Sequence, residues 1–319
     1  MPGRGRKLIN YWPDMSSNLQ DWLLLGLSGI SPRDIKILYE QYQNPAAILK
    51  YISNQIPDIS QALKKVQKII NECQRKKIKI LTLEEKLYPE KLKNISDPPA
   101  VLYTRGEPNN PSTQPILAVV GTRKATSYGK SFLEKIIPDL VASGFIIVSG
   151  LALGIDTMAH RLTLENKGTT WAVLGNGLNY CYPATNHSLF LRIAEIGALI
   201  SEFPPGTQPR TWHFPQRNRL IAGISDGVLV VEADCRSGAL ITARFAADEG
   251  REVLALPGSI FNQRSGGCHW LIKEGAALVE KTEDILEVFN RPPLFPEKKK
   301  DNLKFTETER AILKILEEG

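Results

Sequence analysis

Short apolar runs that alternate with amphipathic segments fill most of the chain after residue 110. The runs ILAVVG, FIIVSG, TWAVLG, ALIS, GVLVVEA and EVLALPG are rich in Val, Ile and Leu. Helical patterns lie between them, at residues 127–144, 154–168, 186–197, 217–225 and 237–250. Apolar strands that alternate with helices are typical of a parallel sheet covered on both faces. We therefore predict an α/β fold with a Rossmann-like, doubly wound and mainly parallel sheet, in a domain at 79–290 whose core is 110–290.

A helical pattern precedes this domain. Apolar residues recur at helical spacing from Leu19 to Cys73, and Gly26, Gly29 and Pro32 interrupt them. This predicts a small all-α domain over 17–78, similar to a SAM or helix-hairpin-helix module. A helix-hairpin-helix offers backbone N–H groups to a DNA phosphate, but Ser31 stands where that motif usually has its second glycine. A module that only packs or binds protein is therefore the alternative.

The remaining segments are expected to connect or to extend these two domains. We expect a flexible N-terminus at 1–16. Residues 76–115 read as a linker region that contains one strand-like stretch, VLYTRG. Residues 291–319 begin with a spacer rich in Pro and Lys, and Thr306 with Glu309 then forms a capping box. This last segment is predicted to be a linker and the first helix of an incomplete winged helix.

Composition narrows the class of protein. With 42% hydrophobic and 23% charged residues the chain is typical of a globular protein. No apolar run is long enough for a membrane span or a signal peptide, so we expect a cytoplasmic protein without membrane contact. The cysteines and histidines show no metal-ligand spacing, so neither a metal site nor a cofactor is predicted. Residues 1–100 hold 16 Lys and Arg against 10 Asp and Glu, and the rest of the chain is neutral.

Small, hydroxyl and basic residues follow the predicted strands, at the edge where open parallel sheets bind ligands. Glycines allow a close approach, helix N-termini present N–H groups, and arginines add forked donors for phosphate. Asp156 is placed to accept from free amides. The chain lacks the GxGxxG, GxxxxGK[ST] and GxSxG motifs of nucleotide cofactor sites and hydrolases. The candidate residues are Gly121, Thr122, Arg123, Gly150, Phe214, Arg217, Asn218, Arg219, Ser237, Gly238 and Thr242.

Arg217 and Arg219 stand in the stretch HFPQRNRLIAG. On a helix their side chains would point about 200° apart, so one of them would face the protein. A buried guanidinium needs an anionic partner, either a phosphate or a carboxylate. Carboxylate partners such as Glu202 or Glu232 would make these arginines structural.

These stretches together resemble the DprA/Smf family of bacterial DNA-processing proteins. The resemblance is carried by VVGTRKATSYG, VSGLALGIDTMAHR, the region from ISEFPPG to VLALPG, and GGCHWLIKEGA. It implies a non-catalytic protein that binds single-stranded DNA and loads a RecA-type recombinase on it during DNA uptake in natural transformation. It also implies a homodimer, formed around HWLIKEGAALVE. The candidate residues would then bind nucleic acid, with the arginines on phosphates and Phe214 stacked on a base.

Two features leave other interpretations open. Cys268 and His269 stand where the family commonly has Thr-Asn. A LOG-like Rossmann nucleotide phosphoribohydrolase is the enzymatic alternative, although PGSIFNQRSGGC does not supply the PGGxGT loop of that class. A scaffold that mainly contacts another protein is the third interpretation.

Overall fold

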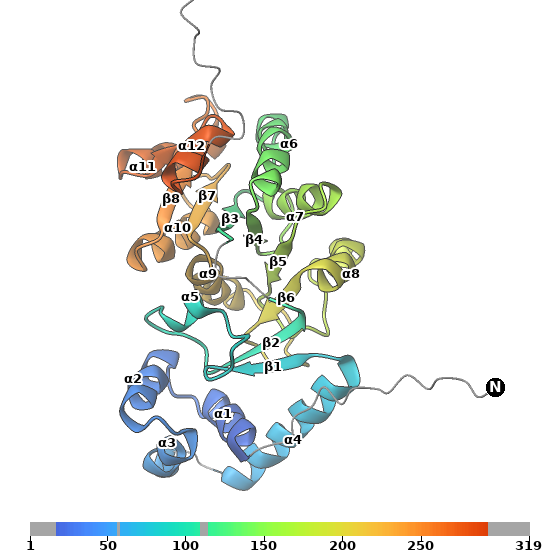
Figure 1. The fold of residues 1–319 in the computed structure, drawn as a ribbon, viewed down its shortest axis with the longest axis vertical. Coiled ribbons are helices and arrows are strands. Elements are labelled where there is room, and N and C mark those ends of the chain that lie inside the picture. Colours follow the sequence, from blue (N-terminus) through green and yellow to red (C-terminus); the bar gives the residue numbers. More distant parts are fainter. Residues whose placement is uncertain (1–16, 56–57, 109–113, 293–319) are drawn as a thin grey trace, which may run out of the picture.

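The computed structural model describes residues 17–55, 58–108 and 114–292. The flexible segment predicted at 1–16 and the winged-helix start predicted at Thr306 lie outside these residues. Within them the model contains helices and one sheet (Figure 1). None of the described helices is both long and apolar enough to cross a bilayer.

Four helices form the N-terminal part: α1 (Ser17–Leu27), α2 (Pro32–Tyr42), α3 (Pro45–Tyr51) and α4 (Ile59–Lys76). Ser31 caps α2, because its hydroxyl accepts from the Asp34 amide (3.1 Å) and donates to the Asp34 carboxylate (2.7 Å). Gly29, in the turn before it, has a positive φ of 82°. The serine that departs from the helix-hairpin-helix pattern is therefore the N-cap of the second helix.

The sheet has nine strands in the order β1-β2-β6-β5-β4-β3-β7-β8-β9. From β6 to β9 all neighbours are parallel. The six apolar runs in the sequence form the central strands, as predicted. The strands are β1 (Lys79–Thr82), β2 (Val101–Gly106), β3 (Ile116–Val120), β4 (Ile146–Ser149), β5 (Thr170–Val173), β6 (Ala198–Ser201), β7 (Gly227–Val230), β8 (Glu252–Ala255) and β9 (Ala277–Leu278).

The linker interpretation of residues 76–115 was wrong for residues 79–106, although the strand-like stretch within them is confirmed. VLYTRG forms β2, which pairs antiparallel with β6, and β1 pairs antiparallel with β2. Both strands extend the sheet beyond its parallel part. Strands of four to six residues at a sheet edge carry a weak local signal, because pairing with a distant segment decides their formation.

Helices cover both faces of the sheet (Figure 1). Along β3, Leu117 and Val119 pack with α6 and α7, whereas Ala118 and Val120 belong to the core on the other face, with α9 and α10. The helices of this part are α5 (Glu90–Lys93), α6 (Ser127–Ala142), α7 (Ile155–Glu165), α8 (His187–Ile196), α9 (His213–Ile224), α10 (Gly238–Asp248), α11 (Gly266–Lys273) and α12 (Thr282–Val288).

The N-terminal helices share a hydrophobic core with the sheet. Trp22 of α1 and Leu102 of β2 are buried in the same cluster as residues of the central strands. Polar contacts add to this interface, since Lys36 Nζ donates to the Ile95 carbonyl (2.8 Å) and the Tyr39 hydroxyl to Glu84 (2.9 Å). The helical part and the sheet are therefore packed as one body.

Candidate nucleic-acid interface

A cavity of about 490 Å³ lies where the strand order reverses. The chain runs outward from β3 through β4, β5 and β6, and then places β7 on the other side of β3. Crevices at such switch points, beyond the carboxyl ends of the strands, are the usual ligand sites of open α/β sheets. The predicted residues that line this rim pocket are Gly121, Thr122, Arg123, Phe214, Arg217, Asn218, Ser237, Gly238 and Thr242.

An aromatic pair forms one wall of the rim pocket. The Phe214 ring stacks on Tyr182, with centroids 5.5 Å apart and planes 28° from parallel, and the Arg123 guanidinium lies 5.7 Å from the Phe214 centroid. Phe214 is half-buried, whereas Tyr182 and Arg123 are exposed. The pair therefore combines apolar ring surface with a solvent-facing cation.

Arg217 lies beneath the rim pocket with only 5% of its surface exposed. Its Nη1 donates to the carbonyls of Gly150 (2.7 Å) and Val173, and its Nε donates to Asn218 Oδ1 (3.2 Å). Burial lowers the pKa of Arg217 to about 10, so the side chain remains cationic at neutral pH. A Cβ atom at Gly150 would overlap the guanidinium, which explains why a glycine is needed there.

Asp156 is the anionic partner beneath the rim pocket. Its Oδ2 accepts from the amides of Gly150 (3.1 Å) and Ala152 (3.4 Å), as predicted for a residue that satisfies free amides. Burial raises the pKa of Asp156, and the nearby Arg217 opposes the shift. This carboxylate therefore holds the loop after β4, and its charge favours the cationic form of Arg217.

The start of α10 closes the opposite side. The Ser237 hydroxyl accepts from the Ala239 amide (3.2 Å), and Asn218 Nδ2 donates to the Gly238 carbonyl (3.2 Å). The Gly238 amide, the first of the helix, has no intrahelical acceptor. A helix N-terminus that opens into a cavity favours an anion such as phosphate.

The loop after β3 is fixed by Glu232. Its carboxylate accepts from the Thr126 amide (2.9 Å) and hydroxyl (2.5 Å), while the Thr122 amide donates to its carbonyl (2.7 Å). These contacts hold Gly121, Thr122 and Arg123 at the mouth of the rim pocket. Both buried carboxylates near the pocket, Asp156 and Glu232, are thus engaged in holding loops.

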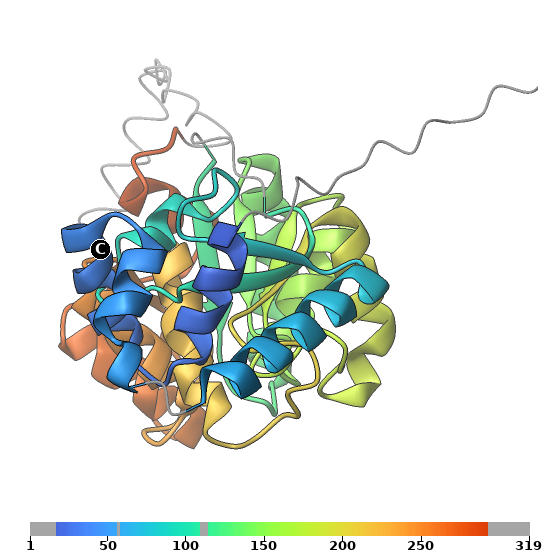
Figure 2. The same ribbon diagram turned by 90° about the horizontal axis from the view of Figure 1, so that it is seen from below.

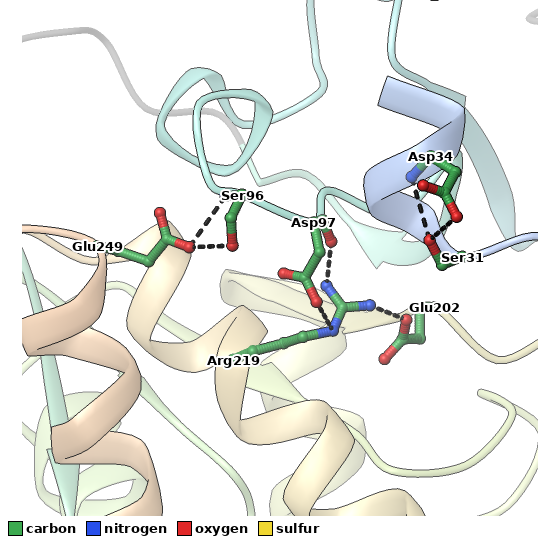
Figure 3. Close-up of polar contacts among 7 residues, drawn as sticks. All are labelled: Ser31, Asp34, Ser96, Asp97, Glu202, Arg219 and Glu249. Atoms are coloured by element: carbon green, nitrogen blue, oxygen red, sulfur yellow. Dashed lines mark hydrogen bonds and ion pairs between the residues drawn. The ribbon is translucent and has the colours of Figure 1, made fainter. Parts of the chain in front are cut away.

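Arg219 is not brought into the rim pocket (Figure 3). Its guanidinium pairs with Glu202, donates to the Asp97 carbonyl (2.7 Å) and lies 3.4 Å from the Asp97 carboxylate. Burial raises the pKa of both carboxyls, and Arg219 opposes the shift. The partners of Arg219 are therefore carboxylates, which makes this arginine structural and not a candidate binding residue.

The Cys268-His269 pair also lies outside the residues that line the rim pocket. Cys268 is buried, and its thiol lies 3.6 Å from the Val230 carbonyl. His269 Nε2 is 2.9 Å from the Gly258 carbonyl. Cys268 therefore packs against the end of β7, and His269 supports the loop after β8.

Tyr182, Thr211 and Ile241 line the rim pocket but were not predicted. Tyr182 lies in NYCYP, in the loop that follows the third apolar run. This position after a strand could have identified it as a pocket residue. Thr211 and Ile241 carry no comparable signal, because the packing of α9 against α10 brings them to the cavity.

Comparison with known proteins identifies relatives of this chain. The family model described as DNA recombination-mediator protein A matches residues 79–290. The DNA processing protein DprA of Bacillus subtilis is 41% identical over 230 residues, which cover 72% of this chain and 77% of that protein. The X-ray structure of DprA from Streptococcus pneumoniae superposes with a TM-score of 0.72 at 37% identity, covering 85% of this chain and 98% of that one. The structure of DNA processing protein A from Helicobacter pylori, described for its single-stranded DNA binding mode, has a TM-score of 0.60 at 30% identity. The match covers 66% of this chain and 96% of that one.

Proposed function

The chain belongs to the DNA recombination-mediator protein A family, and from this premise we propose that it binds single-stranded DNA in the rim pocket. The observation that carries the proposal is the aromatic pair of Phe214 and Tyr182 beside the exposed Arg123. Stacking on aromatic rings together with cationic contacts to phosphate is the usual means of binding single strands without sequence preference.

Each wall of the rim pocket has a distinct role in this proposal. A base stacks on the aromatic pair, and the flanking phosphate lies between Arg123 and the start of α10. Arg217 acts indirectly, because its donors are directed at the Gly150 and Val173 carbonyls and at Asn218. It shapes the pocket floor and adds positive potential to it.

We further propose that the bound strand is handed to a RecA-type recombinase during DNA uptake, and that the protein acts as a cytoplasmic homodimer without catalysis. Exposed apolar side chains support a protein interface near the predicted segment. Phe261 is 93% exposed, and Ile260, Trp270 and Leu278 are also exposed. Exposed large apolar side chains are more frequent at association surfaces than elsewhere on a protein.

The experiment that tests the binding proposal is a titration with single-stranded and double-stranded oligonucleotides of equal length over a series of salt concentrations. We expect tighter binding of the single strand, since a duplex cannot stack its paired bases on Tyr182 and Phe214. Equal affinity for both forms would contradict the stacking role. Incubation with nucleoside monophosphates tests the enzymatic alternative, because release of free base would contradict a non-catalytic protein.

A further inference from the structure

Helix α4 carries most of the basic excess of the N-terminal half. Lys64, Lys65 and Lys68 are exposed on it, and its last turn and C-cap add Arg75, Lys76 and Lys77. The helix contains one acidic residue, Glu72, which pairs with Arg75 (2.8 Å). In the part of the chain that the structure describes, the three lysines nearer the N-terminus form no ion pair.

Helix stability does not explain these three lysines. Cations are favourable in the last turn, where the helix dipole is negative, which accounts for Arg75 and Lys76. Lys64 and Lys65 lie nearer the opposite end, and Lys68 lies at the middle of the helix. Lys64 and Lys68 are also four residues apart, a spacing at which like charges destabilise a helix. Their accumulation therefore needs another physical reason.

A groove joins this helix to the sheet domain. A cavity of about 480 Å³ is lined by Lys65, Lys68, Ile69 and Glu72 of α4, by Leu27 of α1, and by the loop segment 204–207. The Glu72 carboxylate is already paired with Arg75. Figure 2 shows α4 crossing the near side of the molecule, with the chain that leads to α9 beneath its N-terminal half. The groove has an apolar floor of Leu27, Ile69 and prolines, and lysines on its rim.

The loop that lines this groove continues directly into the rim pocket. It passes Arg210 and Trp212 and reaches Phe214, on the pocket wall. Trp212 is 56% exposed, and the Arg210 guanidinium lies over its ring, 5.2 Å from the centroid. An exposed indole with an adjacent cation is a stacking platform for a base. The connection between pocket and groove thus carries the same chemistry as the pocket.

We propose that the groove between α4 and the 204–207 loop binds the backbone of the same single strand beyond the nucleotides held in the rim pocket. This inference rests on the proposed function. The strand crosses Trp212 and Arg210 and places its phosphates against Lys65 and Lys68, the two lysines that line the groove. The N-terminal helices then extend the binding site instead of serving only as a packing module.

The test uses the full-length protein and oligothymidylates of about 4 to about 16 nucleotides, which span common single-strand site sizes. The groove variant is Lys65→Gln/Lys68→Gln. Its matched control, Lys86→Gln/Lys135→Gln, removes two other exposed lysines and the same net charge. All of these side chains are exposed, and melting temperatures of the three proteins verify equal folding.

We expect the groove variant to bind the shortest oligonucleotides as the parent does, and to lose affinity for the longest. Two lost phosphate contacts should reduce the logarithmic salt slope of the longest probe by about 1.4, at about 0.7 for each contact. The control should keep the parent slope. An unchanged slope at every length, with short probes still bound, overturns the groove inference alone. Absence of binding at every length, by the parent protein too, overturns the proposed function.

Discussion

At the scale of single residues, burial and partners separate three arginines that look alike in the sequence. Arg123 is exposed at the mouth of the rim pocket. Arg217 is buried beside Asp156, and Arg219 is buried between Glu202 and Asp97. Arg123 is accessible to a phosphate, whereas the guanidinium groups of Arg217 and Arg219 already donate hydrogen bonds to other groups of the protein. The three should therefore respond differently to the same substitution.

Arg123→Ala should weaken binding and leave folding intact. Its loss should reduce the logarithmic salt slope by about 0.7. Arg217→Ala should instead lower the free energy of unfolding, because it removes the buried donor of the Gly150 and Val173 carbonyls, at about 1–3 kcal/mol for a buried carbonyl left unsatisfied. Denaturant unfolding and salt-dependent anisotropy on both variants check this difference. Equal stability of the two variants would contradict the structural role of Arg217.

The aromatic pair should contribute through stacking and not through charge. Tyr182→Ala and Phe214→Ala should each cost about 1–3 kcal/mol of binding free energy while the salt slope stays unchanged. Phe214→Trp should retain most of the affinity. Because Phe214 is half-buried, the melting temperature of the Phe214→Ala variant must be measured on the preparation used for binding. Lower stability with unchanged affinity per folded molecule would make Phe214 a packing residue only.

At the scale of elements, the sequence predicts the strands and helices that have a clear local pattern. It fails for elements whose formation depends on pairing with distant segments. The apolar runs identify the six central strands because five of them are buried throughout, and β8 is buried over its second half. The strand β1 was missed, and β2 was read as part of a linker, because their antiparallel pairing depends on segments far along the chain. The same holds within α9, where spacing shows that Arg217 and Arg219 point apart but not which of them reaches the rim pocket.

Helix α9 is held from the side opposite the rim pocket by the Arg219 cluster of Figure 3. Arg219→Met should reduce the free energy of unfolding by about 3–5 kcal/mol, because Glu202 would remain buried without its cation. Adding Glu202→Gln should recover part of this loss, since no unpaired charge is then buried. Denaturant unfolding of the single and double variants measures the coupling. Purely additive losses would contradict the pairing.

At the scale of the whole molecule, the region below the rim pocket couples pH to folding. His160 is fully buried, with Nδ1 2.6 Å from the Thr170 hydroxyl. Burial, together with the nearby Arg217, lowers the pKa of His160 to about 3, from an ordinary value near 6.5. The folded state thus excludes a proton that the unfolded state accepts below pH 6.5. The contribution of neutral His160 to stability is present above pH 6.5 and is lost as the pH falls towards 3.

His160→Gln should flatten this part of the pH dependence. In the parent protein the histidine should lower the free energy of unfolding by up to about 1.4 kcal/mol per pH unit below 6.5. Denaturant unfolding of parent and variant at a series of pH values between 7 and 4 isolates the contribution as a difference. Parallel curves would show that His160 is protonated equally in both states.

The central claim is that bases of a single strand enter the rim pocket beside Tyr182 and Phe214. Photo-crosslinking tests it most directly, with an oligothymidylate that carries a photoreactive thymine and peptide mapping of the adduct by mass spectrometry. The account predicts adducts on the loop with Tyr182 and on the start of α9 with Phe214, reduced by an excess of unlabelled single strand. Adducts confined to segments that do not line the rim pocket would contradict it.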